Sequence, residues 1–444
     1  MNKLAEDLNQ LIWTNTPCVC QMLSSLGKEL YYPKGIISQS AEAKQKATRY
    51  NATIGIATEG EQAMHLPSVM KQFSGHLPNE VLPYAPAAGK PELRRKWREE
   101  MRSKNPTLRD KSISLPIVTS GITHGLSLAA DLFVDPGDTV LLPDQAWGNY
   151  NMIFSVRHGA NVQRYRFFSD SNGFDSKGFR DTVLKHSTSG KLVVLLNFPN
   201  NPTGYSVTKA EAMDIRDALV EVAERDCNIV TVCDDAYFGL FYEDDVCKES
   251  VFGYLADKHN RLLAIKLDGA TKEDYVWGFR VGFMTFATGA GSAEVYDALE
   301  KKTAGAIRGN ISNCPHHSQS IILKAMQDSA YQEQKRQKYD VMKARAMAVK
   351  KTLSDPRFSK IWTAYPFNSG YFMCLRLNGI DAEQYRVRLL EEYGIGIIAV
   401  GQSDVRVAFS CVEEKDIPAL FDLMFRCATE IQEDSQNLVE RAVS

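Results

Sequence analysis

The chain has 444 residues, which is more than one hydrophobic core usually accommodates and predicts about two or three domains. Apolar residues make up 44% and charged residues 24% of the sequence, as in ordinary soluble globular proteins. The net charge of −2 gives no electrostatic reason to expect nucleic acid or a membrane surface as a partner.

The N-terminal stretch MNKLAEDLNQLIW carries Glu6 and Asp7 where a secretory signal requires apolar residues. No apolar stretch reaches the ~18 residues of a membrane-spanning helix. The nine cysteines are scattered and include no CxxC pair, so we expect reduced thiols and no metal site. These features predict a cytoplasmic protein.

In chain order, the first predicted elements are a short capped helix at 38–50 and an extended, glycine-bearing segment at 50–60. From about residue 115, short apolar strands alternate with helical stretches. The strands are continuous runs of Val, Ile and Leu, which indicates burial on both faces and hence a parallel sheet between layers of helices. The predicted strands are SLPIVTSG (114–121), TVLLPD (139–144), KLVVLLNF (191–198), NIVTVCDD (228–235), RLLAIKL (261–267) and VGFMTF (281–286).

A second region begins near residue 315, where residues 316–350 are rich in helix formers. Three later apolar segments are separated by helices, as in an α+β layer. We predict an α/β protein whose large domain, 61–315, holds the mostly parallel sheet flanked by helices. A smaller α+β domain would comprise residues 1–60, including an N-terminal arm, and residues 316–444. The three later segments are SGYFMCLRL (369–377), GIGIIAV (394–400) and DVRVAFSCV (404–412).

Polar residues follow several predicted strands of the large domain. In an open α/β sheet, ligands bind in the crevice beyond the carboxyl ends of the strands. One polar residue there would mean little, whereas a succession of them favours a site. The residues are Ser120, Asn201, Asp234, Tyr237 and Lys272.

Two of these segments suit a phosphate group. Ser120, Gly121 and Ile122 open a helix, so the serine hydroxyl and the free backbone N–H groups can surround an anion. Arg280 comes eight positions after Lys272 and offers a planar, permanently charged fork to the same phosphate. Each residue also has an ordinary explanation, since serine is a common helix N-cap and basic residues in turns are usually solvated.

Asp234 and Lys272 suit an aromatic aldehyde with a ring nitrogen. Asp234 ends a buried strand, where a carboxylate is costly unless it faces a cation or a donor such as a protonated pyridine nitrogen. Lys272 in the same crevice would be partly desolvated, which lowers its pKa and lets the amine form a Schiff base. Together these groups predict a site for pyridoxal 5'-phosphate.

Three motifs carry a resemblance to a known family: NNPTG at 200–204, DDAY at 234–237 and TKEDYVWGFRVG at 271–282. From about residue 50 to the end, the chain resembles the class I aminotransferases of the fold-type I pyridoxal phosphate enzymes, which include aspartate and aromatic aminotransferases. The resemblance implies that Asp234 binds the pyridine nitrogen. It also implies that Asn201 and Tyr237 bind the phenolic oxygen of the cofactor.

Further segments extend the resemblance. DQAWGNYN at 144–151 implies that Trp147 stacks on the pyridine ring, and LPYAPAAGKPELR at 82–94 implies that Tyr84 reaches the phosphate of a partner subunit. DVRVAFS at 404–410 implies that Arg406 binds the α-carboxylate of the substrate, beside Asn201 and Trp147. AIRGNISNCP at 306–315 implies that Arg308 crosses the dimer interface to a side-chain carboxylate of the substrate, although it could instead only pair across that interface.

The chain departs from the family at four positions. Gly269 stands where the family often has a phosphate-binding serine, for which Thr271 or a backbone N–H would substitute. Tyr150 and Leu196 replace the two histidines of aspartate aminotransferases, and Thr53 replaces a glycine of the loop over the substrate, which would narrow the pocket. These changes leave the cofactor residues in place and leave the substrate open.

The resulting hypothesis is an aminotransferase that works by ping-pong exchange through a Schiff base at Lys272. It would transfer an amino group between aspartate, an aromatic or a related amino acid and a 2-oxoacid such as 2-oxoglutarate, in a homodimer with shared active sites. A pyridoxal phosphate-dependent lyase or decarboxylase is the alternative. A cofactor-sensing regulator is disfavoured because the sequence has no spare N-terminal helical domain and no basic patch.

Overall fold

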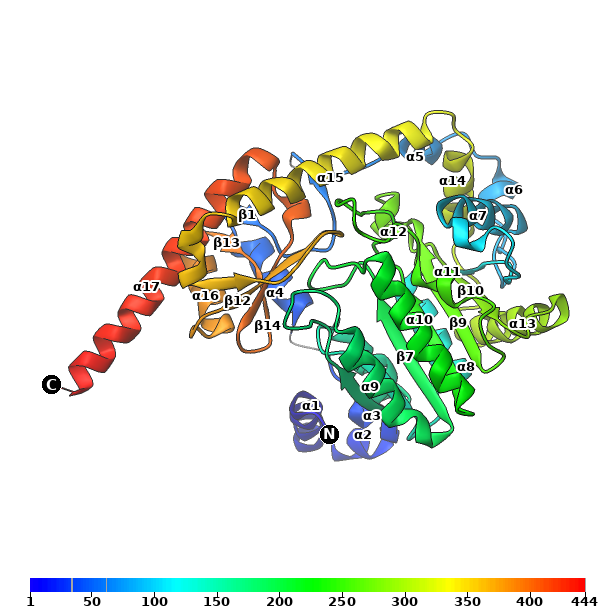
Figure 1. Cartoon of the computed structure of the whole chain (residues 1–444), viewed down its shortest axis with the longest axis horizontal. Coiled ribbons are helices and arrows are strands. Elements are labelled where there is room, and N and C mark those ends of the chain that lie inside the picture. Colours follow the sequence, from blue (N-terminus) through cyan, green and yellow to red (C-terminus); the bar gives the residue numbers. More distant parts are fainter. Residues whose placement is uncertain (33–34, 61, 444) are drawn as a thin grey trace.

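The computed structural model describes residues 1–32, 35–60 and 62–443, with residues 37 and 435–443 described by their backbone alone. The two larger of the four β-sheets in the described ranges lie side by side, and the long helix α15 (Tyr331–Leu353) runs along one side of both (Figure 1). The N-terminal helices α1 (Lys3–Asn15), α2 (Pro17–Met22) and α3 (Ser25–Glu29) pack on one another, and α3 contacts the segment that follows Tyr150.

The larger sheet has seven strands in the order β4-β10-β9-β8-β7-β5-β6. All neighbouring pairs are parallel except those of β10, which runs antiparallel to both β4 and β9. The prediction of a mostly parallel sheet flanked by helices is therefore confirmed. The strands are β4 (Ile117–Thr119), β5 (Thr139–Pro143), β6 (Asn161–Tyr165), β7 (Lys191–Asn197), β8 (Asn228–Asp234), β9 (Leu262–Gly269) and β10 (Gly282–Thr288).

Helices cover both faces of this sheet because its strands are apolar on both faces. In β7, Leu192, Val194 and Leu196 belong to one hydrophobic core, whereas Val193 and Leu195 belong to the core on the opposite face. Continuous apolar runs of this kind require two covering layers. The covering helices are α8 (Ile122–Phe133), α9 (Ser176–His186), α10 (Lys209–Glu224), α11 (Val251–Leu255) and α13 (Ala293–Asn310).

The register of the parallel strands brings several polar residues to one edge of the sheet. Asn197 at the end of β7 pairs with Asp234 at the end of β8, and Asp234 pairs in turn with Leu267 of β9. The chain leaves β9 into the short helix α12 (Ala270–Glu273) and returns as β10, so the connection that carries Lys272 lies at the same edge.

The smaller sheet is antiparallel, in the order β11-β12-β15-β14. It packs with α15 and with α17 (Ile417–Val443), which form one core with the sheet's apolar side chains. The strands are β11 (Trp362–Ala364), β12 (Met373–Leu377), β14 (Ile398–Val400) and β15 (Asp404–Val407), and the helix α16 (Ala382–Tyr393) lies between β12 and β14 in the sequence.

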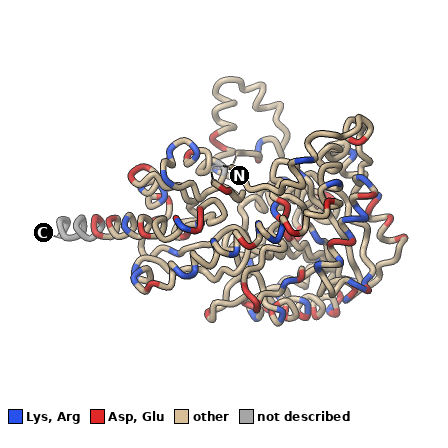
Figure 2. The backbone as a smooth tube through the Cα atoms, turned by 90° about the horizontal axis from the view of Figure 1, so that it is seen from above, with Lys and Arg blue, Asp and Glu red and all other residues tan. Residues whose placement is uncertain are grey.

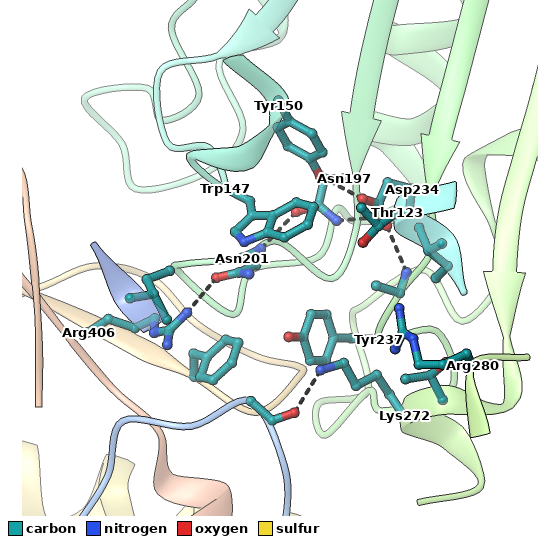
Figure 3. A pocket seen from close by; sticks show the side chains of 16 residues that line it. Thr123, Trp147, Tyr150, Asn197, Asn201, Asp234, Tyr237, Lys272, Arg280 and Arg406 are labelled. Carbon is teal, nitrogen blue, oxygen red and sulfur yellow. Dashed lines mark hydrogen bonds between the residues drawn. The ribbon is translucent and has the colours of Figure 1, made fainter. Parts of the chain in front are cut away.

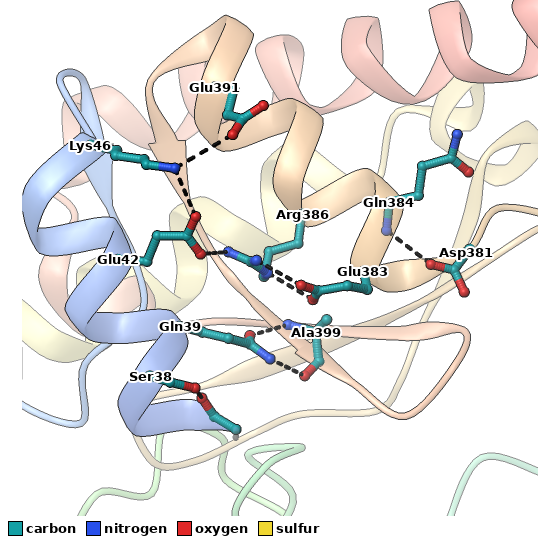
Figure 4. A network of polar contacts seen from close by, with 11 residues as sticks. Ser38, Gln39, Glu42, Lys46, Asp381, Glu383, Gln384, Arg386, Glu391 and Ala399 are labelled. Carbon is teal, nitrogen blue, oxygen red and sulfur yellow. Dashed lines mark hydrogen bonds and ion pairs between the residues drawn. The ribbon is translucent and has the colours of Figure 1, made fainter. Parts of the chain in front are cut away.

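The N-terminal part of the chain joins this smaller sheet through α4 (Ile36–Lys46). Glu42 forms an ion pair with Arg386 of α16 at 3.0 Å (Figure 4). The side-chain amide of Gln39 donates a hydrogen bond to the backbone oxygen of Ala399 and accepts one from its backbone N–H. The strand β1 (Tyr50–Asn51) then pairs with β13 (Ile395–Gly396). The helix predicted at 38–50 therefore begins earlier, at Ile36, and Gly35 provides no side-chain cap. It ends at Lys46 because the chain must then extend so that β1 can pair with β13.

The other helices include α5 (Pro67–Met70), α6 (Pro78–Val81), α7 (Pro91–Lys104) and α14 (His316–Met326), of which α14 contacts the other three. The division into 61–315 against 1–60 with 316–444 stays a prediction. Basic and acidic residues are interspersed along the backbone (Figure 2). Within the described ranges, every helix is too short or too polar to cross a bilayer.

Candidate active site

A pocket opens where the carboxyl ends of the large sheet face the smaller sheet (Figure 3). Its volume is about 260 Å³, enough for a small organic ligand. Residues from widely separated segments line it, and most of the residues predicted from sequence are among them. These are Ile122, Trp147, Asn201, Asp234, Tyr237, Lys272, Arg280 and Arg406.

Lys272 projects from α12 into the pocket, and its amine donates a hydrogen bond to the backbone oxygen of Gly55 at 2.7 Å. The amine also lies 4.9 Å from the centre of the Tyr237 ring. Burial, and then the positive charges of Arg406 and Arg280, lower the pKa of Lys272 to about 7. A large fraction of this amine is therefore uncharged near neutral pH, which makes it nucleophilic.

Asp234 lies opposite Lys272, and both its oxygens accept hydrogen bonds. One accepts from the hydroxyl of Tyr150 at 2.7 Å and the other from the backbone N–H of Ala236 at 3.1 Å. The amide of Asn197 donates to the Asp234 backbone oxygen at 2.9 Å, which fixes the end of β8. Burial raises the pKa of Asp234 to about 6, although the two hydrogen bonds oppose this rise.

The N-terminus of α8 forms a third side of the pocket with Arg280. The backbone of Gly121 has a φ of +76°, and a Cβ atom at this position would collide with the Arg280 guanidinium. Glycine is therefore required where the arginine lies across the start of the helix. Ile122 and Thr123 of the first turn line the pocket, whereas Ser120 does not, and its backbone N–H donates to His124 at 3.0 Å.

Arg406 of β15 reaches the pocket from the smaller sheet. Its guanidinium donates to the Asn201 side-chain oxygen at 3.0 Å and to the backbone oxygen of Thr53 at 2.8 Å. It lies 4.0 Å from the centre of the Phe372 ring, and its Nε is buried without a hydrogen-bond partner among the described residues. A buried cation with an unused donor is suited to binding an anion.

Thr53 does not narrow the pocket, contrary to the expectation from sequence. Its side chain is buried and donates to Asn51 at 2.6 Å, and only its backbone oxygen approaches Arg406. Gly55, two residues later, is the residue that faces Lys272, and a Cβ there would lie 3.2 Å from the amine. The position that must stay small is therefore Gly55.

Gly269 at the end of β9 pairs with Gly282 at the start of the antiparallel strand β10. A Cβ atom at Gly269 would lie 2.6 Å from the backbone oxygen of Val281 and 2.8 Å from Cα of Gly282. This close approach explains why the chain has no serine at this position. Thr271, the predicted substitute, lines the pocket beside Lys272.

Besides Ser120 and Gly121, two predicted residues lie outside the pocket of this chain. Tyr84 is 89% exposed, and Arg308 is exposed at the end of α13, where it donates to the hydroxyl of Ser312. Both were expected to act across a dimer interface, so their roles stay predictions. Other pocket residues were not singled out as functional from sequence: Ile36, Gly55, Thr123, Tyr150, Asn197 and Phe372.

The charges in the pocket are unbalanced. Lys272, Arg280 and Arg406 face it with only one carboxylate, Asp234. Among the described residues, no carboxylate lies within 4.0 Å of any of the three basic groups. Two anionic groups and one basic ring nitrogen on the ligands would complement this set of side chains. The phosphate and pyridine ring of pyridoxal 5'-phosphate, together with an amino-acid carboxylate, supply those groups, so the residues fit the cofactor.

Behind the pocket, the two acidic residues that follow Lys272 form an ion-pair cluster. Glu273 pairs with Lys104 at the end of α7 and with Lys335 near the start of α15. Asp274, which is fully buried, pairs with the same Lys335 at 2.8 Å and accepts a hydrogen bond from Tyr331 at 2.6 Å. The cluster fixes the turn that carries Lys272 to two helices distant in sequence.

Comparison with known proteins agrees with this geometry. The family "Aminotransferase class I and II" matches residues 51–422. The aspartate aminotransferase of Sulfurisphaera tokodaii is 27% identical over 350 residues, which cover 75% of this chain and 79% of that protein. That of Pyrococcus horikoshii is 25% identical over 396 residues, 86% of this chain and 93% of that protein.

The crystal structure of an aminotransferase from Anaerococcus prevotii has a TM-score of 0.79 at 24% identity, and the match covers 89% of this chain and 96% of that one. The chain belongs to the class I and II aminotransferase family.

Proposed function

We propose that this aminotransferase uses pyridoxal 5'-phosphate bound covalently to Lys272, and that it exchanges an amino group between an amino acid and a 2-oxoacid. One observation carries the proposal. A lysine whose pKa is lowered to about 7, a buried carboxylate and two arginines that pair with no acidic residue of the described chain all line one pocket. Their chemistry matches the aldehyde, the ring nitrogen and the phosphate of the cofactor and the carboxylate of the substrate.

Each group has a defined place in the proposal. Arg280 and the first turn of α8, including Thr123, would hold the phosphate. Asp234 would hold the ring nitrogen in its protonated form, and the ring would lie against Trp147. The remaining polar atom of the ring, the phenolic oxygen, would accept hydrogen bonds from Asn201 and Tyr237, both of which line the pocket.

The residues of the chain then perform the positioning and the proton transfer. The bound cofactor supplies an electron sink for the negative charge that develops at the substrate Cα. Arg406 binds the α-carboxylate through its two-pronged guanidinium and so orients the Cα–H bond. The substrate amine would first replace Lys272 on the cofactor, and the freed amine of Lys272 would then take the proton from Cα as a general base.

The substrate side chain is proposed from similarity. Aspartate aminotransferases are among the relatives, which favours aspartate, an aromatic or a related amino acid as donor and 2-oxoglutarate as acceptor. The first 2-oxoacid must leave before the second enters the same pocket, so we expect ping-pong kinetics. Arg308 of a partner subunit would bind the second carboxylate of a dicarboxylic substrate.

A homodimer with shared sites is part of the proposal, as is a cytoplasmic location. Large apolar side chains are exposed close to Tyr84 in the sequence, namely Phe73, Leu77 and Leu82. Exposed apolar residues gathered in one segment are typical of a surface that a protein partner covers. Tyr84 would then reach the phosphate in the partner's pocket.

The covalent attachment is tested by borohydride reduction of the purified, cofactor-loaded protein. We expect the cofactor to stay on the peptide that contains Lys272, and to be lost from Lys272→Ala but not from the surface variant Lys302→Ala. Retention of the cofactor by reduced Lys272→Ala would contradict the assignment.

The reaction class is tested separately, with candidate amino acids and 2-oxoglutarate. We expect one new amino acid to form for each 2-oxoacid released. Carbon dioxide or a side-chain fragment without a new amino acid would instead indicate a decarboxylase or a lyase.

A further inference from the structure

The hydroxyl of Tyr150 is the one side-chain donor to the Asp234 carboxylate in the described part of the chain. The O–O distance is 2.7 Å, and both residues are buried, Tyr150 to 1% and Asp234 to 3% exposure. Tyr150 directly precedes the π-helix Asn151–Arg157, and the edge of its ring contacts Trp147 with 5.5 Å between ring centres. The tyrosine is thus fixed on one side by the helix and on the other by the pocket wall.

We infer that Tyr150 is a positioning residue that acts through Asp234: its hydrogen bond keeps the carboxylate ionised where the cofactor's ring nitrogen would bind. The inference rests on the proposed function, because it assumes that Asp234 faces that nitrogen. A hydroxyl donor stabilises the carboxylate and cannot accept its charge, so it favours the ionised form. The bond occupies one position on one oxygen and leaves a second acceptor position free.

The surroundings of Asp234 show why such a donor is needed. The titratable groups that interact with Asp234 are Tyr150, Tyr237, Lys272 and its two chain neighbours, Cys233 and Asp235. Asp235 raises the pKa of Asp234, and Lys272 lowers it, but Lys272 is itself partly uncharged near neutral pH. The Tyr150 hydrogen bond is the largest influence that opposes burial and keeps the carboxylate charged.

The direction in which loss of the Tyr150 hydroxyl changes cofactor affinity follows from the charge of Asp234. Asp234 must be ionised to bind a protonated ring nitrogen, and removal of the Tyr150 donor raises the pKa of Asp234 further. Cofactor affinity should therefore weaken on the acidic side and stay unchanged where the carboxylate is ionised in both proteins. A hydrogen bond to a charged group is worth enough to shift the midpoint by about one pH unit.

The test measures the dissociation constant of pyridoxamine 5'-phosphate, which binds without a covalent link to Lys272, from about pH 5 to about pH 8. The full-length proteins are the wild type, Tyr150→Phe and the matched control Tyr165→Phe. Tyr165 is also fully buried, and its hydroxyl donates to the Leu195 backbone oxygen at 3.0 Å outside the pocket. Titration of the ligand itself is the same for all three proteins and cancels in their comparison.

We expect Tyr150→Phe to bind roughly tenfold more weakly than the wild type at the acidic end, and equally at the alkaline end. Tyr165→Phe should follow the wild type throughout. An analogue with carbon in place of the ring nitrogen should bind Tyr150→Phe and the wild type alike at every pH, because it has no nitrogen that pairs with the Asp234 carboxylate.

The inference is overturned if Tyr150→Phe follows the wild-type profile, or if it weakens both ligands equally at every pH. The same shift in Tyr165→Phe would overturn it too. The assignment of Asp234 is checked independently with Asp234→Asn, which should lose the preference for the nitrogen-containing ring. If Asp234→Asn keeps that preference, the proposed function fails at Asp234. If Asp234→Asn loses it and Tyr150→Phe is unchanged, only the role of Tyr150 fails.

Discussion

The amine of Lys272 and the backbone oxygen of Gly55 form a 2.7 Å hydrogen bond between parts of the chain that are 217 residues apart. Gly55 belongs to the segment that follows β1, the strand that pairs with β13, whereas Lys272 follows β9 of the larger sheet. The bond holds Lys272 in the pocket. Because Gly55 has no side chain, its backbone lies directly against the amine nitrogen of Lys272.

Gly55→Ala should therefore disturb Lys272 directly. The added Cβ would lie 3.2 Å from the amine and 3.5 Å from the Phe372 ring, so the amine must shift. We expect covalent attachment of the cofactor to slow by about fivefold, equivalent to ~1 kcal/mol of overpacking. Stopped-flow absorbance measures this rate. Gly305→Ala on α13, where a Cβ meets nothing within 4 Å, is the control and should react at the wild-type rate.

Asp234→Asn should retain the cofactor but lose the negative charge that keeps the ring nitrogen protonated. We expect the chemical step to slow by at least about 100-fold, or roughly 3 kcal/mol. Single-turnover kinetics with an excess of protein isolate this step from product release. The exposed Asp217→Asn should leave it unchanged, and wild-type rates in Asp234→Asn would remove Asp234 from the role proposed for it.

Gly269→Ser introduces the serine that the family often has, at a position where this chain has no room for it. Its Cβ would lie 2.6 Å from the Val281 backbone oxygen, so β9 and β10 must separate locally. We expect the free energy of unfolding to fall by about 1–3 kcal/mol in urea titrations. Thr271→Ser, which removes one methyl group beside the same turn, provides the comparison. A stable Gly269→Ser with tighter cofactor binding would contradict the steric reason for the glycine.

Arg308→Ala tests the dicarboxylate hypothesis. If Arg308 of a partner subunit binds the second carboxylate of 2-oxoglutarate, its loss should raise the Michaelis constant of that substrate by the equivalent of about 2–5 kcal/mol. The constant for a neutral amino acid should change little. Lys301→Ala on the same helix, whose side chain pairs only with Asp297 among the described residues, is the control. Equal effects on charged and neutral substrates would make Arg308 a structural interface residue.

Much of the fold and the cofactor pocket could be predicted from sequence because the relevant signals are local. Continuous apolar strands that end in a polar residue predicted both the parallel sheet and the edge that carries Asp234 and Lys272. The same signal is present at Asn197, which ends the apolar run KLVVLLN, but the NNPTG motif directed attention to Asn201 instead. The family match confirms the enzyme class that these motifs predicted.

The contacts that depend on packing between distant segments could not be predicted in this way. Thr53 was expected to face the pocket, but its orientation depends on the β1–β13 pairing, which turns its side chain toward Asn51. The role of Tyr150 as a donor to Asp234 depends on how the π-helix after it meets the end of β8. The roles expected of Tyr84 and Arg308 involve a second subunit and stay predictions.

The ion-pair cluster behind Lys272 has a consequence for the way the molecule opens. Lys335 bridges Glu273 and Asp274, and Lys104 holds Glu273 from the other side. Separating any one of these helices would leave a charge buried without its counter-charge, so their local openings are coupled. In hydrogen–deuterium exchange, the protected backbone amides of α12, the end of α7 and the N-terminal turns of α15 should consequently share one free energy of opening, as a single cooperative unit around Lys272.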